Sequence, residues 1–224
     1  MKNGYSIGLI MPCYNEEEGL KIMLPKIPEL IDEVIIVDNN STDETANIAK
    51  SYGCTVIQEK KQGYGAAYKR GFRYNNNDIA VTMDADDTYP LEEIEKNLMY
   101  LIHTESDFLN CSRFPLKNEE SMYLTNKIGN KILTLESQLL FGYDLLDSQS
   151  GMVIFKKEIF DFIFPKSDEM ALCQELKLLA LMNDNIKFNE SHINYKARIG
   201  EVKLNKWRDG LDNMCQMLKM RFSN

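Results

Sequence analysis

The stretch "VTMDADDTYP" (residues 81–90) sets three aspartates, Asp84, Asp86 and Asp87, directly after a short apolar run. The apolar run is typical of a buried strand, and the acids would stand at its carboxyl end. Carboxylates this close repel one another, and burying them without partners is costly. They could form an acidic cap on a following helix, which the helix dipole favours. Alternatively, Asp84 and Asp86, two positions apart, could converge on one divalent cation, which takes oxygen ligands.

Short apolar runs alternate with longer mixed segments on both sides of this stretch. Strands are expected at 6–12, 33–38, 54–59, 78–84 and 107–113, and helices at 15–31, 43–52, 64–76 and 91–104. The helix start signals are a capping-box pattern at Ser41 and Glu44 and a proline, Pro90, at a first-turn position. This alternation predicts an α/β fold, with a mostly parallel sheet flanked by helices. In such sheets ligands bind beyond the carboxyl ends of the strands.

The second half of the chain is less regular. Helices are expected at 123–142, 168–184 and 206–222, and strands at 151–156 and 187–196. The first of these helices carries an apolar stripe of Leu124, Ile128, Ile132, Leu135 and Leu139. No repeat, linker or low-complexity tract interrupts the sequence, so residues 1–224 are interpreted as a single domain.

Charge and cysteine usage argue against several classes of function. The 224 residues carry 26 Lys and Arg against 34 Asp and Glu, a net charge of −8, which disfavours broad attraction to nucleic acid. Five scattered cysteines and two distant histidines disfavour a structural zinc site and fit reduced thiols in a cytoplasmic protein. The N-terminus lacks the apolar core of a signal peptide, and no apolar run approaches the roughly 18 residues of a membrane span.

Polar stretches follow four of the expected strands in order. They are "PCYNEEE" (12–18), "DNNSTDET" (38–45), "KQGYGAA" (61–67) and "DADDTYP" (84–90). Because the ends of parallel strands meet at one edge of a sheet, this order predicts a single cleft. Asp38 could accept a hydrogen bond from a uracil or guanine N–H, or hold a ribose hydroxyl. Gly63 and Gly65 let the backbone approach a ligand, but Tyr68 stands where the dinucleotide fingerprint needs a third glycine.

Together these four elements resemble the nucleotide-binding half of family 2 glycosyltransferases, which have the GT-A fold. The resemblance covers residues 1–113. The residues that match the family pattern are Pro12, Asn15, Glu16, Asp38, Ser41, Asp43, Gly63, Gly65, Asp84, Ala85 and Asp86. The resemblance implies that a UDP- or GDP-sugar binds in the cleft and that Asp84 and Asp86 hold Mg²⁺ or Mn²⁺ against its diphosphate. Tyr14, which could stack on the base, and Asn40 complete the expected donor site.

Residues 114–224 would then form the acceptor half. Within it, "DSQSGMVIFKKE" (147–158) and "RIGEVKLNKWRDG" (198–210) are similar to segments of the polyprenyl-phosphate sugar transferases, which include the dolichol-phosphate mannose synthases. The resemblance implies an inverting transfer of a sugar to a polyprenyl or dolichyl phosphate, for glycan or glycoprotein assembly. Two positions depart from the pattern. Val202 replaces the usual serine, and Thr88 stands where the mannose synthases commonly carry a glutamine, so neither a third metal ligand nor a mannose donor is implied.

The remaining expected roles follow from the charges of the two substrates. Asp86 is the expected metal-holding catalytic residue, and Arg198 and Lys203 would close over the diphosphate. A hydroxyl acceptor would need a general base, for which Asp147 and Glu175 are the candidates, whereas a phosphate acceptor is already anionic and needs little or none. The expected ligands of an acceptor phosphate are Arg113, Lys127, Gln149 and Ser150.

The expected helix at 206–222 raises the question of membrane contact. Its apolar residues recur near helical spacing at Trp207, Leu211, Met214, Cys215, Leu218 and Phe222, with basic residues around them. This pattern suits peripheral attachment to an anionic membrane, at its cytoplasmic face, and it also suits a terminal helix docked on its own domain. Two other functions stay open: a soluble glycosyltransferase acting on a glycan or small-molecule hydroxyl, and a sugar-nucleotide-binding protein without turnover.

Overall fold

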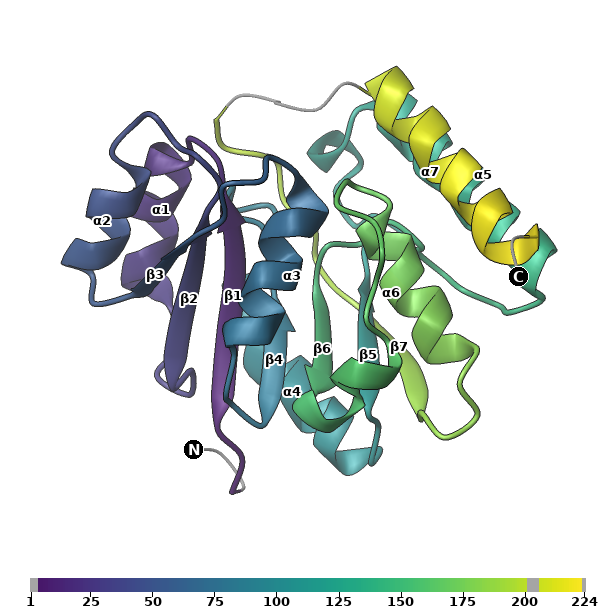
Figure 1. Cartoon of the computed structure of the whole chain (residues 1–224), viewed down its shortest axis with the longest axis horizontal. Helices are drawn as coiled ribbons and strands as arrows, with labels where there is room; N and C mark the ends of the chain where they lie inside the picture. The colour runs from purple at the N-terminus through teal and green to yellow at the C-terminus, as the bar shows by residue number, and fades with distance from the viewer. Residues whose placement is uncertain (1–3, 201–205, 223–224) are drawn as a thin grey trace.

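The structure is a computed structural model that describes residues 4–200 and 206–222, with side chains of the last helix from residue 210 onward. Seven strands form one sheet in the order β3-β2-β1-β4-β6-β5-β7 (Figure 1). The strands are β1 (Ile7–Cys13), β2 (Glu33–Asp38), β3 (Thr55–Gln58), β4 (Ile79–Thr82), β5 (Phe108–Ser112), β6 (Val153–Lys156) and β7 (Phe188–His192). All neighbours pair in parallel except β6, which is antiparallel to both β4 and β5. The expected mostly parallel sheet is therefore confirmed.

Every helix expected from the sequence is present, although the ends differ. The α-helices are α1 (Glu17–Met23), α2 (Thr45–Ser51), α3 (Tyr64–Tyr74), α4 (Ile94–His103), α5 (Leu124–Phe141), α6 (Leu172–Leu181) and α7 (Lys206–Phe222). Short 3₁₀ helices are η1 (Leu24–Lys26), η2 (Leu91–Glu93), η3 (Glu119–Ser121) and η4 (Lys157–Phe162). The segment 15–31 forms only α1 and η1, because Pro25 and Pro28 lack the N–H donor that a continuing α-helix requires.

Helices cover both faces of the sheet (Figure 1). In β1, Leu9 and Met11 belong to the hydrophobic cluster that includes α1 and α4. Ile10, between them, belongs to the other cluster, beneath α3 and α6. Because side chains alternate along a strand, a continuous apolar run such as "IGLIM" serves both faces at once. The three-layer packing fixes the strand ends at which the candidate site lies.

A third, smaller cluster joins α5, α6 and α7 through Leu133, Leu178 and Met217. The apolar stripe expected on 123–142 does not belong to it, because all five of its side chains are more than half exposed. On α7, Met214 packs into the cluster while Cys215 is exposed, so the expected apolar pattern of that helix is divided between two sides. Within the described ranges, none of the helices is long and apolar enough to cross a bilayer.

The loop after β2 corrects the expected capping box. Helix α2 begins at Thr45 without a side-chain cap, so Ser41 and Glu44 do not form one. Instead the Ser41 hydroxyl accepts a hydrogen bond from the backbone N–H of Asn15 (3.0 Å), and Asp43 accepts one from the N–H of Glu17 (3.2 Å). These polar side chains therefore hold the start of α1 against the loop after β2, which fixes one wall of the cleft.

Candidate active site

A cavity of about 530 Å³ opens at the carboxyl ends of β1 and β4. Its walls come from the loops after β1, β2, β3 and β4, the start of α3, the loop before α6, the segment after β7, and α7. The lining residues are Pro12, Cys13, Tyr14, Glu16, Asn39, Gln62, Gly63, Tyr64, Ala67, Asp84, Ala85, Asp86, Glu169, Met170, Arg198, Asp212 and Asn213. Parts of all four polar stretches noted in the sequence thus meet in one cavity, as expected.

Asp84 and Asp86 form the acidic wall of this cavity. Asp84 Oδ1 accepts a 2.7 Å hydrogen bond from the Tyr64 hydroxyl. Burial, together with the nearby charge of Asp86, raises the pKa of Asp84 to about 7. Asp86 Oδ1 accepts hydrogen bonds from the backbone N–H and the hydroxyl of Thr88, at 3.1 and 2.6 Å. Thr88 therefore orients the Asp86 carboxylate through Oδ1. The second carboxylate oxygen, Oδ2, is left for other partners.

Arg198 bridges the two sides of the cavity. Its Nη1 lies 2.8 Å from Oδ2 of Asp86, and its Nη2 lies 3.0 Å from Oε1 of Glu16. The backbone N–H of Ile199 donates to the carbonyl of Asp86 (3.0 Å), so the segment after β7 is fixed beside the acids. One guanidinium thus neutralises part of the acidic charge while remaining a quarter exposed to the cleft.

The glycines of the third polar stretch allow a close backbone approach. Gly63 has φ of +147°, and a Cβ there would lie 2.4 Å from the carbonyl oxygen of Asp168. A Cβ at Gly65 would lie 2.6 Å from the carbonyl oxygen of Ser167. Both glycines are therefore required by the packing of α3 against the loop before α6, and Gly63 also lines the cavity.

Asn39 and the α7 residues Asp212 and Asn213 are lining residues that the sequence analysis missed. Asn39 Oδ1 accepts a hydrogen bond from the N–H of Gly63 (2.9 Å), which joins two of the polar loops. Its position in "DNNSTDET", directly after Asp38, was a usable signal. No comparable signal marks Asp212 or Asn213, because only the docking of α7 brings them to the cleft.

Three residues expected to bind the sugar donor do not line the cavity and instead form hydrogen bonds within the neighbouring loops. The Asp38 carboxylate accepts a hydrogen bond from the N–H of Ser41 (3.0 Å), and Asn15 Oδ1 accepts one from the N–H of Thr42 (2.7 Å). Asn40, which is exposed with φ of +66°, donates to the carbonyl of Lys60 (2.8 Å). These residues shape the loops that border the cavity.

Arg113 and Asp147 form a buried ion pair, which corrects both of their expected roles. The arginine donates from Nε and Nη2 to the two carboxylate oxygens, at 2.8 and 2.9 Å. Burial raises the pKa of Asp147, but the guanidinium of Arg113 outweighs it and the net shift is downward. A carboxylate held this way is a poor proton acceptor, and an arginine that is buried and donates to both oxygens of one carboxylate is a poor ligand for an added phosphate.

Glu175 also lacks the position expected of a general base. It is 2% exposed, and its two oxygens accept hydrogen bonds from the backbone N–H groups of Lys166 and Ser167, at 2.9 and 2.8 Å. Its carboxylate anchors the loop before α6, which in turn packs against Gly65. Glu175 is not among the described residues that line the cavity.

The other expected acceptor residues lie apart from the cavity. Gln149 donates to Gln174 Oε1 (2.6 Å), and the Ser150 hydroxyl donates to the carbonyl of Cys111 (2.6 Å), so both belong to the buried interior. Lys127 pairs with Glu119 at a separate hollow beside α5. Lys203 lies outside the described residues.

Lys177 is a buried cation that the sequence analysis did not identify. Its Nζ donates to the carbonyls of Ser148, Ser150 and Cys173, at 3.1, 2.6 and 3.1 Å. Burial lowers its pKa. The three bonds tie the stretch "DSQS" to α6. This stretch, which is similar in sequence to an acceptor-binding segment, therefore has a structural role in this protein.

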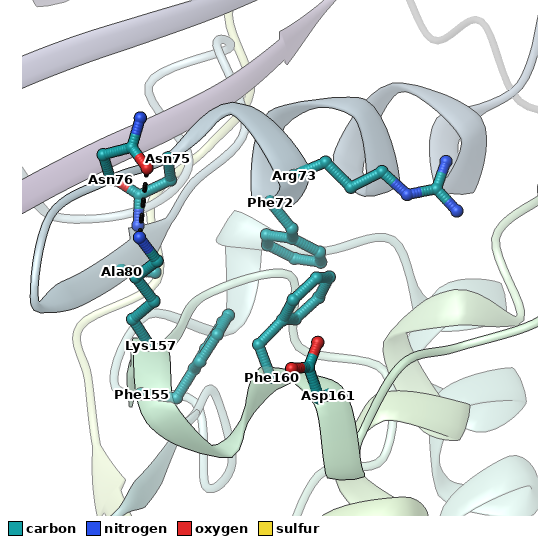
Figure 2. Close-up of a pocket in the computed structure, with 9 residues that line it drawn as sticks. All are labelled: Phe72, Arg73, Asn75, Asn76, Ala80, Phe155, Lys157, Phe160 and Asp161. Carbon is teal, nitrogen blue, oxygen red and sulfur yellow. Dashed lines mark hydrogen bonds between the residues drawn. The ribbon is translucent and has the colours of Figure 1, made fainter.

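A second cavity, of about 280 Å³, lies between the end of α3 and η4. Figure 2 shows the rings of Phe72, Phe155 and Phe160 within it, while the Arg73 side chain runs along α3 away from them. Lys157 donates to the side chain of Asn76 (3.1 Å). The cavity lies near the beginning of β4, at the opposite end of that strand from Asp84, and it lacks a pair of carboxylates. The larger cavity is therefore the candidate site.

A mostly parallel sheet flanked by helices, with two carboxylates, an arginine and a glycine loop meeting beyond its strand ends, fits the GT-A fold of glycosyltransferases. The chain belongs to glycosyl transferase family 2, whose family model matches residues 9–164. It is therefore an enzyme of the glycosyltransferase class, as the motifs indicated.

Curated relatives support this assignment along most of the chain. The dolichyl-phosphate hexose transferase of Haloferax volcanii is 31% identical over 207 residues, which cover 91% of this chain and 89% of the relative. The UDP-N-acetylglucosamine–dolichyl-phosphate N-acetylglucosaminyltransferase of Methanococcus voltae is 29% identical, covering 88% of this chain and 84% of the relative. A hexosyltransferase of low-salt glycan biosynthesis from Haloferax volcanii is also 29% identical, but the chain spans only 53% of its length.

Solved structures share the fold. Glucosyl-3-phosphoglycerate synthase from Mycobacterium tuberculosis, in complex with Mn²⁺, UDP and glucosyl-3-phosphoglycerate, superimposes with a TM-score of 0.73 at 20% identity. The match covers 98% of this chain and 81% of that structure. A second mycobacterial protein gives a TM-score of 0.80 at 16% identity. At these identities the similarity establishes the fold alone.

Proposed function

We propose that this glycosyltransferase transfers a sugar, with inversion, from a UDP- or GDP-sugar to a polyprenyl or dolichyl phosphate. The observation that carries the proposal is the meeting of Asp84, Asp86 and Arg198 at one cavity, beside the loop that begins at Gly63. A nucleoside diphosphate sugar presents a diphosphate that these groups suit. The names of the relatives from Haloferax volcanii and Methanococcus voltae support the lipid phosphate as acceptor.

The acid pair fits a hard divalent cation, Mg²⁺ or Mn²⁺. Among residues 4–200 and 206–222, no three or more His, Cys, Asp and Glu side chains are grouped so as to hold a metal. Mg²⁺ commonly uses one or two carboxylates and fills its other positions with water and substrate phosphates, so two aspartates are sufficient. When bound, the cation would neutralise the charge that develops on the leaving diphosphate. The M. tuberculosis neighbour binds Mn²⁺ and UDP-glucose within the same fold.

Several residues of the chain are proposed to hold the donor. Pro12, Tyr14 and Glu16 lie on the side of the cavity next to the end of β1, where a base would fit against the Tyr14 ring. Arg198 compensates Asp86 in the structure and is positioned to donate to a diphosphate oxygen. Holding the reacting groups in line would supply much of the rate acceleration.

A second candidate function differs from the first in the chemical nature of the acceptor. With Asp147 and Glu175 occupied elsewhere, the two expected bases do not serve the cavity. This favours an acceptor that is already anionic, such as a lipid phosphate. However, Glu169 and Asp212 do line the cavity, and either could act as base for a hydroxyl acceptor. A soluble glycosyltransferase that extends a glycan or small molecule is therefore the second candidate.

Thermal shifts with UDP- and GDP-sugars, with and without Mn²⁺, test the donor and the cation together. A donor at about 100 times its Kd should stabilise the protein by about 2.7 kcal/mol. Asp86→Asn should abolish the part of the shift that depends on Mn²⁺, while Asp87→Asn, one position away, should retain it. An equal shift for both variants would overturn the metal site.

Product analysis tests the acceptor. With radiolabelled nucleotide sugar and a polyprenyl phosphate, label should enter the organic phase. Replacing Glu169 with Gln, or Asp212 with Asn, should leave transfer to a phosphate largely intact, whereas loss of a general base lowers kcat by about 10²–10⁴. Label that stays in the aqueous phase, on a glycan, would favour the second candidate.

A further inference from the structure

Helices α5 and α7 present a broad apolar surface to solvent. We call it the α5–α7 face and define it as Leu124, Ile128, Ile132, Leu135 and Leu139 of α5 with Leu211, Leu218 and Phe222 of α7. Their exposed fractions run from 44% for Leu218 to 77% for Leu139. The two helices lie side by side at one edge of the molecule (Figure 1). Single exposed apolar side chains are ordinary, but five in one stripe along α5, with three more on the adjacent α7, indicate a contact surface.

The same helices already bury a different apolar side. Leu133 of α5 and Met217 of α7 pack in the cluster with α6, and Leu140 and Met214 pack against it. Each helix is therefore apolar on two sides, whereas a surface helix normally has one apolar stripe and an opposite polar face. Docking on the body of the protein accounts for the first side only. The second side needs a further partner.

The charge of the two helices indicates which partner it is. Together α5 and α7 contain six Lys and Arg against three Asp and Glu, a net charge of +3 in a chain whose net charge is −8. Among the basic residues, Lys131 on α5 and Lys219 and Arg221 in the last turn of α7 are exposed, whereas Lys127 is paired with Glu119. Apolar side chains bordered by cations suit an anionic lipid surface, with the apolar groups inserted among the acyl chains.

The position of α7 links this surface to the cleft. Asn213 lines the cavity and donates to Gln149 Oε1 (2.9 Å), which fixes that side of the helix to the interior. Leu211, two positions away and so roughly opposite on a helix, is 62% exposed on the α5–α7 face. One helix thus borders both the donor cleft and the apolar surface.

We propose that the α5–α7 face docks on an anionic lipid bilayer and sets the cleft beside the membrane surface. The inference rests on the proposed lipid-phosphate acceptor. A carrier lipid that is anchored in a bilayer can bring its phosphate to the cleft only from the membrane surface. The proposal assigns the contact to both helices, with α5 supplying five of the eight apolar side chains. The C-terminal segment considered from the sequence alone is only part of this surface.

Sedimentation with lipid vesicles tests the inference on the full chain, without donor or acceptor. The protein should sediment with phosphatidylglycerol vesicles and remain mostly in the supernatant with phosphatidylcholine vesicles. The double variant Ile128→Glu/Leu135→Glu and the single variant Leu218→Glu should each lower the partition coefficient, by about tenfold for each apolar side chain replaced. Phe162→Glu is the matched control, because this side chain of η4 is 68% exposed but lies outside the face. It should bind as the wild type does.

Three outcomes would overturn the docking proposal: wild-type protein that stays in the supernatant with anionic vesicles, face variants that bind as well as the wild type, or a dimer that the face variants dissociate while no form binds vesicles. The last outcome would assign the face to a second copy of the chain. Transfer to a short-chain polyprenyl phosphate in detergent, measured in parallel, separates the two proposals. Transfer without vesicle binding refutes the docking alone, and vesicle binding without transfer to the lipid phosphate refutes the proposed acceptor.

Discussion

At the scale of single residues, the buried carboxyl group of Asp84 makes the stability of the folded protein depend on pH. Burial and the charge of Asp86 raise its pKa to about 7 from the ordinary value of 3.8. Between these values the folded protein keeps a proton that the unfolded chain releases. Because the unfolded state then binds fewer protons, the free energy of unfolding should fall as pH rises from about 4 to about 7, and level off above that.

The variant Asp84→Asn isolates this contribution. Relative to the variant, the wild type should lose up to about 1.4 kcal/mol of stability per pH unit across the window. Urea unfolding at several pH values, without divalent cations, measures it, and Asp87→Asn serves as the control that should follow the wild type. Adding Mn²⁺ should flatten the wild-type profile, because a bound cation favours the carboxylate. Parallel profiles for wild type and Asp84→Asn would refute the raised pKa.

Arg113 gives a second prediction at this scale. Its side chain and that of Asp147 are 7% and 0% exposed, so removing the arginine leaves a buried carboxylate without its partner. Arg113→Ala should lower the free energy of unfolding by about 3–5 kcal/mol. Lys127→Ala, which breaks the far more exposed pair with Glu119, should change it by less than about 1 kcal/mol.

Urea unfolding of both variants measures the difference. The double variant Arg113→Met/Asp147→Leu should regain much of the lost stability, because the unpaired charge is then absent. If Arg113→Ala instead kept its stability and raised only the KM for the acceptor, the phosphate-binding role expected from the sequence would be restored.

At the scale of elements, the start of α3 depends on a close contact with the loop before α6. A Cβ at Gly65 would meet the carbonyl oxygens of Ser167 and Glu169 at 2.6 and 2.8 Å, so Gly65→Ala must push the two elements apart. We expect a loss of about 1–3 kcal/mol in stability and weaker binding of a nucleotide sugar, because Gly63 and Tyr64 line the cavity.

Gly129 provides the matched control within a helix. A Cβ there meets nothing within 4 Å, so Gly129→Ala should stabilise the protein by about 0.5–1 kcal/mol. Chemical denaturation and calorimetric titration with UDP-glucose measure the two effects for each variant. A Gly65→Ala variant with unchanged stability would contradict this prediction, because it would mean that the loop before α6 moves away from the new methyl group at little energetic cost.

The elements themselves were predictable, whereas side-chain partners were not. Periodicity located each described strand and α-helix but not the 3₁₀ helices η3 and η4, and the acids after β4 were correctly expected at a cleft. Asp147 and Glu175 were expected as candidate general bases, yet their partners, Arg113 and the N–H groups before α6, lie 34 and at most 9 positions away. Sequence spacing does not reveal which donors occupy a carboxylate, because the fold decides that.

At the scale of the whole molecule, one sheet joins the two functional halves expected on either side of residue 113 within a single domain. Strand β6 comes from the second half of the chain, but it pairs with β4 and β5, which both come from the first half. The sequence marks β6 as a strand, because "VIFK" is a short apolar run bounded by turns. Local pattern does not specify a position within a sheet, since antiparallel insertion between two earlier strands depends on long-range contacts.

This order predicts that the chain cannot be divided into a donor half and an acceptor half that fold separately. In a fragment of residues 1–113, β4 would lose the partner that pairs Val81 with Ile154, and β5 would have no neighbour that joins it to the sheet. Such a fragment would leave buried strand edges open, a state that favours aggregation. We expect fragment 1–113 to lack the dispersed amide NMR spectrum of a folded protein. The whole chain should unfold in urea in one transition that circular dichroism and tyrosine fluorescence report alike. A folded fragment that binds UDP-glucose, or two separate transitions, would contradict the prediction.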